Sequence, residues 1–505
     1  MDPRGLRADA PLLDAWLSFQ ESAVRPFTIP GHKQRHDLVG DVIAGDVPLY
    51  GGLDSMKLAD GVLADAEARA AVLWGADACR FSVGGSTHGN QALALAVGAP
   101  GDVVVVGRSA HRSMVTALVL AGLTPMWVTP PVEESTGMPV PIPPASLDSA
   151  CADAVRLARD AGTRFAGVFL TDPAYVGTHG DVAAWAEVAH AHGVPLIVDA
   201  AWAAHFGFHP DLPAHALARG ADALVTSAHK SLPAYSQGAL ILARFGIIDP
   251  GRFDAAVEAT HTTSPAGSIL ASIDAARALL ARDGEELLAA AMSAVRAARE
   301  RFAAVPGLVV LGAHQRRAVG GGSAPGWVHR QAAGAPGPGR VDVDPLKLAL
   351  ILAGTGADGT RVEADLIAAG MPLELADRDT LIAMVTLADD TPAVERLVAA
   401  LMGAIDRHRG VPRAVAGLSA YRVAPEQAMD PRAAAFARRR RVPAAAALGR
   451  VSVELIAPYP PGIPILAPGE RITPDALDAL SAARDSGARI AYAADPTLET
   501  FLVAD

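Results

Sequence analysis

The chain has 505 residues, of which 51% are hydrophobic and 19% charged, and its formal net charge is −11. A chain of this length and apolar content can bury more than one core, and its length predicts roughly two to four domains. The negative charge argues against nucleic acid or an anionic membrane as the main partner and favours a small polar substrate.

The two cysteines, Cys79 and Cys151, have no neighbouring residues at metal-ligand spacing. We therefore expect neither a disulfide scaffold nor a metal site, and a reducing cytoplasm is the natural setting. The N-terminus lacks the continuous apolar core of a signal peptide. No stretch of about 18 apolar residues is free of Pro, Gly or charge, so the sequence predicts a cytoplasmic protein with no membrane partner.

The predicted elements begin with an N-terminal arm, in which residues 12–27 are helical and Pro30-Gly31 breaks the pattern. From about residue 64, helices alternate with apolar strands, which favours a mostly parallel sheet with helices on both faces. The strand candidates are residues 103–106, 125–128, 167–170, 195–198, 223–226 and 240–242.

Three later segments have distinct compositions. Residues 129–144 are rich in Pro, Thr and Glu and are predicted to form a loop, and residues 266–301 form a long helix that leads to a smaller domain. Arg438 to Arg441 are a basic cluster, predicted to form a solvated helix face or a set of ion pairs, and a role near an acidic or carboxylate substrate stays open.

A glycine-rich turn follows the apolar run Phe81-Ser82-Val83. It reads Gly84-Gly85-Ser86-Thr87-His88-Gly89-Asn90 and precedes the helical run that starts at Gln91. Small residues let the backbone approach a phosphate, and a helix N-terminus offers unpaired N–H groups. The turn lacks the Lys-Ser/Thr ending of a P-loop and the spacing of a dinucleotide site. It therefore resembles a phosphate cradle of another type.

Lys230 and Asp199 each follow a predicted buried strand, where an α/β fold places its chemistry. A lysine there can bind pyridoxal 5'-phosphate (PLP) as a Schiff base. A carboxylate can hold the pyridine nitrogen protonated, which deepens the electron sink that PLP provides. Together the two residues suggest PLP chemistry at an amino-acid α-carbon.

With these residues in view, the sequence resembles the fold-type I PLP enzymes of the ornithine/lysine/arginine decarboxylase family, in the short form without an N-terminal wing domain. The resemblance covers nearly the whole chain, and the order of its blocks is more specific than any one of them. The matching blocks are residues 30–34, 84–87, 111–113, 171–177, 199–202, 227–230, 262–265, 458–464 and 468–470.

This resemblance implies a role for each matching residue. Lys230 is the Schiff-base lysine, Asp199 binds the pyridine nitrogen, and His111 stacks on the cofactor ring, with Lys230 or His111 giving a proton to the product. The remaining cofactor contacts are the phosphate-binding Ser86, Thr87, Ser227 and His229, the aromatic Trp202, and Thr262 and Thr263, which reach a neighbouring subunit's phosphate. The shared site implies a homodimer or a higher homo-oligomer.

On the substrate side, Glu470 is the candidate for a basic end, because a carboxylate recognises ammonium or guanidinium by charge-assisted hydrogen bonds. Asp172 and His32, which lie in other matching blocks, are the further candidates.

The resemblance further implies an α/β large domain of the aspartate aminotransferase type with a smaller α+β domain. We expect an N-terminal arm at residues 1–55, a PLP-binding domain at 56–305, a small α+β domain at 306–415 and a C-terminal decarboxylase-type domain at 416–505. The predicted function is decarboxylation of arginine, lysine or ornithine. The alternatives are another PLP-dependent reaction at the α-carbon, by an aminotransferase, lyase or oxidase, and a catalytically silent regulatory homologue.

Overall fold

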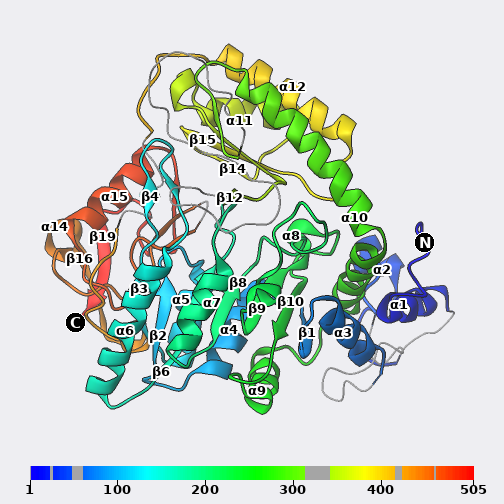
Figure 1. The fold of residues 1–505 in the computed structure, drawn as a ribbon, viewed down its shortest axis with the longest axis horizontal. Helices are drawn as coiled ribbons and strands as arrows, with labels where there is room; N and C mark the ends of the chain where they lie inside the picture. The colour runs from blue at the N-terminus through cyan, green and yellow to red at the C-terminus, as the bar shows by residue number, and fades with distance from the viewer. Residues whose placement is uncertain (1, 23–26, 48–60, 313–341, 416–422, 460–461) are drawn as a thin grey trace.

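A seven-stranded sheet forms the centre of the molecule, with the strand order β1-β10-β9-β8-β6-β2-β3 (Figure 1). The structure, a computed structural model, describes residues 2–22, 27–47, 61–312, 342–415, 423–459 and 462–505. The strands are β1 (Ala78–Ser82), β2 (Val103–Gly107), β3 (Thr124–Val128), β6 (Phe165–Thr171), β8 (Leu196–Asp199), β9 (Ala223–Ser227) and β10 (Ala239–Ala243). Only β10 runs against its neighbours within this sheet. The predicted mostly parallel α/β sheet is confirmed.

Helices cover both faces of this sheet, which explains why its strands are apolar without alternation. In β2, Val103 and Val105 join one core and Val104 and Val106 the other. The helices on the first side are α3 (Val62–Leu73), α6 (Pro144–Ala161), α7 (Val182–Ala191) and α10 (Gly267–Ala303), and those on the second are α4 (Gly85–Val97), α5 (Arg112–Ala121) and α9 (Pro250–Thr260). Burial of the strands on both sides therefore fixes their register.

The small domain lies at the top of Figure 1, where the 37-residue helix α10 reaches it from the large domain. Its antiparallel sheet has the order β11-β13-β15-β14. The elements are β11 (Val309–Val310), β13 (Lys347–Ile351), α11 (Gly359–Ala368), β14 (Leu375–Ala376), β15 (Thr380–Met384) and α12 (Thr391–Arg407). A separate pairing of β12 (Asp342–Val343) with β7 (Thr178–His179) joins this domain to the large one.

The C-terminal elements lie at the left of Figure 1 and enclose their own apolar core. They are α13 (Pro431–Phe436), β16 (Arg439–Pro443), α14 (Ala444–Ala447), β17 (Ala457–Tyr459), α15 (Pro474–Asp485), β18 (Arg489–Ala491) and β19 (Thr500–Ala504). At the opposite side of the molecule, α1 (Pro11–Glu21) packs on α10, and α2 (His36–Val39) follows it. Among the described ranges, no helix is long and apolar enough to cross a membrane.

Three sequence predictions are wrong in detail. The helix predicted over residues 12–27 ends at Glu21, where Ser22 is already extended. The predicted loop at 129–144 contains a hairpin of β4 (Val132–Glu133) and β5 (Met138–Pro139). Three residues of the arginine cluster, Arg439 to Arg441, lie on strand β16 and not on a helix, because their backbone pairs with β19; their side chains are exposed as expected. The four-part domain division stays a prediction, and its 55/56 boundary, like Pro460 and Pro461 of the C-terminal block, lies outside the described residues.

Helix α4 packs so closely on β9 that Gly89 has no room for a side chain. A Cβ there would lie 2.3 Å from Cγ2 of Val225. We predict that Gly89→Ala lowers the free energy of unfolding by about 1–3 kcal/mol, because strand or helix must shift. Gly403→Ala in α12 is the control, since the nearest atom is the flexible end of Arg407 at 3.4 Å, and it should be neutral or stabilise by up to about 1 kcal/mol. Equal responses of the two variants in urea unfolding would contradict this packing argument.

Candidate active site

Asp199 and Lys230 lie at the carboxyl ends of two adjacent parallel strands. Asp199 ends β8, opposite Val225 of β9, and Lys230 lies in the short helix α8 (Ala228–Ser231) that directly follows β9. Burial lowers the pKa of the Lys230 amine, and the nearby Asp199 charge opposes that shift. The amine therefore gives up its proton more readily than a surface lysine does.

A neutral amide holds the Asp199 carboxylate in place. Asn90 Nδ2 donates to Asp199 Oδ2 at 2.8 Å, and the backbone N–H of Ala201 donates to Oδ1 at 3.2 Å. Asn90 also donates to Ser113 Oγ at 2.9 Å, and that hydroxyl lies 2.9 Å from His111 Nδ1. Because Asn90 and the backbone N–H are neutral, they orient the carboxylate without cancelling its charge. That charge can pair with a cation such as a protonated ring nitrogen.

The two predicted phosphate-binding segments meet although 141 residues separate them. Ser86 Oγ, in the first turn of α4, lies 2.7 Å from Ser227 Oγ at the end of β9. Gly85 has φ +67°, and its N–H donates to the carbonyl of Gln237 at 2.8 Å. Thr87 is half-buried in the same turn. Two hydroxyls at a helix N-terminus are a suitable donor set for a phosphate.

Hydrogen bonds determine which ring nitrogen carries the proton in two histidines at the site. His111 caps α5, and its Nδ1 accepts the backbone N–H of Ser113 at 3.3 Å, so the neutral ring carries its proton on Nε2. His229 Nδ1 lies 3.0 Å from the carbonyl of Gly238, which can only accept, so this nitrogen donates. Burial lowers the pKa of both rings. His229 can therefore donate to a phosphate from Nε2 only when its ring is protonated.

An indole, that of Trp202, lies beside Lys230 where the large and small domains meet. Lys230 Nζ lies 3.8 Å from the centroid of the Trp202 ring, and the ring of Tyr175 meets this indole edge-on at 5.2 Å. A second lysine, Lys347 of β13, places its Nζ 3.7 Å from the same centroid. The large domain thus supplies Lys230, Trp202 and Tyr175, and the small domain supplies Lys347.

Sequence reasoning did not single out Asn90 or Lys347. Asn90 lies one helical turn after Ser86, so the i, i+4 spacing places both on one face of α4. Lys347 is one of only four lysines in the chain and opens an apolar strand. Because buried lysines are rare, a lysine at the start of an apolar strand could have been recognised from the sequence as a candidate site residue.

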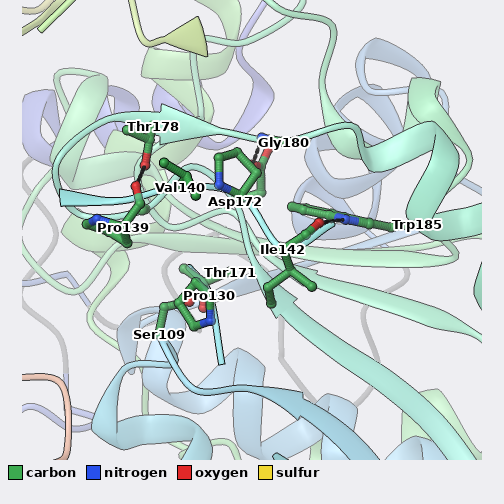
Figure 2. A pocket seen from close by; sticks show the side chains of 12 residues that line it. Ser109, Pro130, Pro139, Val140, Ile142, Thr171, Asp172, Thr178, Gly180 and Trp185 are labelled. Atoms are coloured by element: carbon green, nitrogen blue, oxygen red, sulfur yellow. Dashed lines mark hydrogen bonds between the residues drawn. The ribbon is translucent and has the colours of Figure 1, made fainter. Parts of the chain in front are cut away.

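Asp172 lies next to Asp199, because its backbone N–H donates to the carbonyl of Asp199 at 3.1 Å. Its Oδ1 accepts the N–H of Gly180 at 2.7 Å, and burial raises the pKa of the carboxyl to about 7. Figure 2 shows it in a small pocket whose lining also includes Thr178 and Trp185. Asp172 therefore titrates near neutral pH.

In the part of the chain that the structure describes, no hydrogen bond or ion pair joins four other predicted residues to this cluster. His32 binds Asp46 at 3.1 Å through Nε2 and accepts the N–H of Gln34 through Nδ1. Thr262 and Thr263 are exposed at the end of α9. Glu470 is fully buried, and its role is considered next.

The geometry of Glu470 argues against the predicted substrate contact. Its Oε1 lies 2.6 Å from Arg108 Nη1, and its Oε2 accepts from Arg108 Nη2 at 2.9 Å and from the N–H of Ala467 at 2.7 Å. The Arg108 guanidinium also lies over the Trp127 ring at 4.8 Å. Both carboxylate oxygens are thus committed to an ion pair that joins the C-terminal elements to the large domain.

Comparisons with known proteins match both parts of the chain to one family. Residues 10–391 match the sequence model of the Orn/Lys/Arg decarboxylase major domain, and residues 416–490 match that of its C-terminal domain. An arginine decarboxylase from Halalkalibacterium halodurans is 30% identical, and one from Bacillus subtilis is 29% identical; each match covers 94% of both chains. The solved lysine decarboxylase of Francisella novicida is similar in fold, with a TM-score of 0.81 and 20% identity over 98% of this chain and 81% of that one.

Removing the charge of Glu470 should affect stability rather than substrate binding. In Glu470→Gln, the buried Arg108 loses its counter-ion, and we predict a loss of about 3–5 kcal/mol in the free energy of unfolding. The matched control is Glu426→Gln, which breaks the solvent-exposed pair with Arg471 and should cost less than about 1 kcal/mol. A Glu470→Gln protein of normal stability with a raised KM would instead support the substrate role.

Proposed function

Because this chain belongs to the Orn/Lys/Arg decarboxylase family, we propose that it removes the α-carboxylate of a basic amino acid with PLP bound at Lys230. The protein is an amino-acid decarboxylase, a carbon–carbon lyase. The observation that carries the cofactor assignment is the convergence of Lys230, Asp199 and the Ser86–Ser227 pair at one edge of the sheet.

The residues at this edge fit PLP in chemistry. Lys230 would hold the cofactor through its amine, Asp199 would pair with the ring nitrogen, and Ser86, Thr87 and Ser227 would bind the phosphate. When bound, PLP supplies an electron sink for the pair of electrons left when the bond to the carboxylate breaks.

The chain itself supplies the groups that move a proton. The lowered pKa of Lys230 brings its amine closer to neutral pH, where a group can both give and accept a proton. His111 is the second candidate donor, since its neutral ring carries a proton on Nε2 while Ser113 fixes Nδ1. Trp202 and Tyr175 exclude water from one side of Lys230, which strengthens the electrostatic interactions there.

Arginine is the substrate that we place first, with lysine second and ornithine third. The support is that two relatives of nearly the same length are named arginine decarboxylases. Asp172 remains our candidate for the basic end of the substrate, because it lies beside Asp199 and lines a pocket. A contact from His32 stays a prediction.

Lys230→Ala tests the reaction and the cofactor site together. We predict that the wild-type protein with PLP releases CO2 from arginine, and that Lys230→Ala lowers the rate by at least roughly 10²–10⁴-fold, the contribution of a positioned acid–base group. Borohydride treatment should fix PLP to the peptide containing residue 230 in the wild type only, as measured by mass spectrometry.

The masses of the products distinguish decarboxylation from the alternative functions. A keto acid formed only when an acceptor is added would indicate an aminotransferase. A protein that binds PLP without consuming any amino acid would indicate a silent homologue.

We further propose that the protein works as a homodimer with shared active sites. The N-terminal arm exposes large apolar side chains, Phe27 at 94% and Val42 at 84% among them, which is unfavourable in water. Thr262 is exposed, while the preceding His261 packs its ring on His88 near the phosphate cradle.

Cys79 and Cys151 are buried and unpaired, in keeping with the cytoplasmic setting, which stays a prediction.

A mixing experiment distinguishes shared sites from separate ones. Lys230→Ala and the double variant Thr262→Asp/Thr263→Asp should each be inactive, the second because its carboxylates repel a phosphate. If the threonines serve the partner's site, a hybrid dimer contains one intact site, and random mixing by co-expression should restore about one quarter of wild-type activity. No recovery, in a preparation shown by tag affinity to contain hybrid dimers, would contradict the shared site.

A further inference from the structure

Lys347, the first residue of β13, is a buried lysine that lies beside the half-buried Lys230. It is 3% exposed, and its Nζ lies 3.7 Å from the centroid of the Trp202 ring, which Lys230 Nζ approaches to 3.8 Å. The sum of these two distances limits how far apart the two amines can be. Both amines therefore contact the same indole ring.

Buried contacts from both domains fix the backbone around Lys347. Its N–H donates to the carbonyl of Asp344 at 3.1 Å, and Arg299 Nη2 donates to the carbonyls of Asp344 at 2.9 Å and Lys347 at 2.7 Å. From the large domain, the carbonyl of Gly177 accepts the N–H of Asp344 at 2.8 Å. A Cβ on Gly177, which has φ +97°, would lie 3.0 Å from Cβ of Lys347. The side chain is thus positioned by the junction of the two domains.

The ammonium group of Lys347 contacts aromatic rings rather than an acid. Within the described ranges, no hydrogen bond or ion pair of its Nζ is recorded, and its contacts are the rings of Trp202 and, at 5.6 Å, Tyr175.

The two acids that act on Lys347 through their charge have partners of their own. Asp344 Oδ1 binds His205 Nε2 at 3.1 Å and accepts the N–H of Leu346 at 2.9 Å. Glu374 Oε1 accepts the hydroxyl of Tyr175 at 2.9 Å. Burial lowers the pKa of Lys347 to about 8. The positive charge of Lys230 lowers this pKa as well, whereas the negative charges of Asp344 and Glu374 raise it. The site therefore favours an incoming anion.

We propose that Lys347 binds the α-carboxylate of the amino acid substrate. This inference rests on the proposed function of the site. An amino acid that reacts there brings its α-amine to the Lys230 amine, and its carboxylate is attached only one carbon away. A charge-assisted hydrogen bond from Lys347 would orient the substrate on the indole face of Trp202. The product amine has no carboxylate, so Lys347 would discriminate substrate from product and favour product release.

The test compares an amino acid with its own decarboxylated amine. Lys347→Met removes the ammonium and keeps an unbranched side chain against Gly177, and Lys347→Arg retains the charge. Dissociation constants come from the rapid change in cofactor absorbance on mixing PLP-loaded protein with L-arginine or with agmatine, before turnover.

We expect Lys347→Met to weaken arginine binding by about 10- to 100-fold, the usual range for a hydrogen bond to a charged group, with agmatine binding unchanged within about twofold. Lys347→Arg should retain most of the affinity for arginine. Parallel losses for both ligands, or no loss for arginine, would overturn the proposal.

A second variant covers the case in which Lys347→Met does not fold. Lys347→Gln keeps a polar side chain in place of the ammonium, and it should likewise lose affinity for arginine and not for agmatine in the same rapid-mixing measurement. Equal losses for the two ligands would count against the carboxylate contact. Both readouts are independent of CO2 release, so a protein that binds the carboxylate through Lys347 without decarboxylation would refute the proposed function alone.

Discussion

The parallel pairing of β8 with β9 is the contact on which the site depends, because it sets Asp199 and Lys230 at one edge of the sheet. In a parallel pair, both strands end on the same side, so their last residues face one space. Burial on two faces prevents either strand from slipping, since a one-residue shift would turn buried side chains such as Val198 and Leu224 to the wrong core. The carboxylate and the amine are therefore fixed by backbone hydrogen bonds rather than by flexible loops.

Helix α4 adds the third part of this arrangement. Its first turn brings Ser86 to Ser227, and its second turn brings Asn90 to Asp199. The close packing of Gly89 on Val225, between these two residues, holds the helix at the distance that both contacts require. One helix thus sets the spacing between the phosphate cradle and the carboxylate.

Buried cations connect the domains around this edge. Arg299 binds the carbonyls of Asp344 and Lys347 at the start of β13, and Arg108 pairs with Glu470 of the C-terminal elements. A buried cation is costly unless an ion pair or hydrogen bonds compensate it, so both contacts oppose a change in how the domains pack. The ammonium of Lys347 is set apart from these, since its recorded contacts within the described ranges are aromatic faces. The domain junction therefore orients a cation toward the site.

The sequence by itself determined the α/β class, the positions of most strands, and the roles proposed for Lys230 and Asp199, because apolar runs and the residues that end them are local patterns. It also indicated the phosphate cradle, through a glycine-rich turn before a helix. Only the tertiary structure decided that Glu470 pairs with Arg108 and that Lys347 shares an indole with Lys230. Each of these contacts joins segments far apart in the chain, and which acid meets which cation depends on domain packing, for which a single sequence carries no local signal.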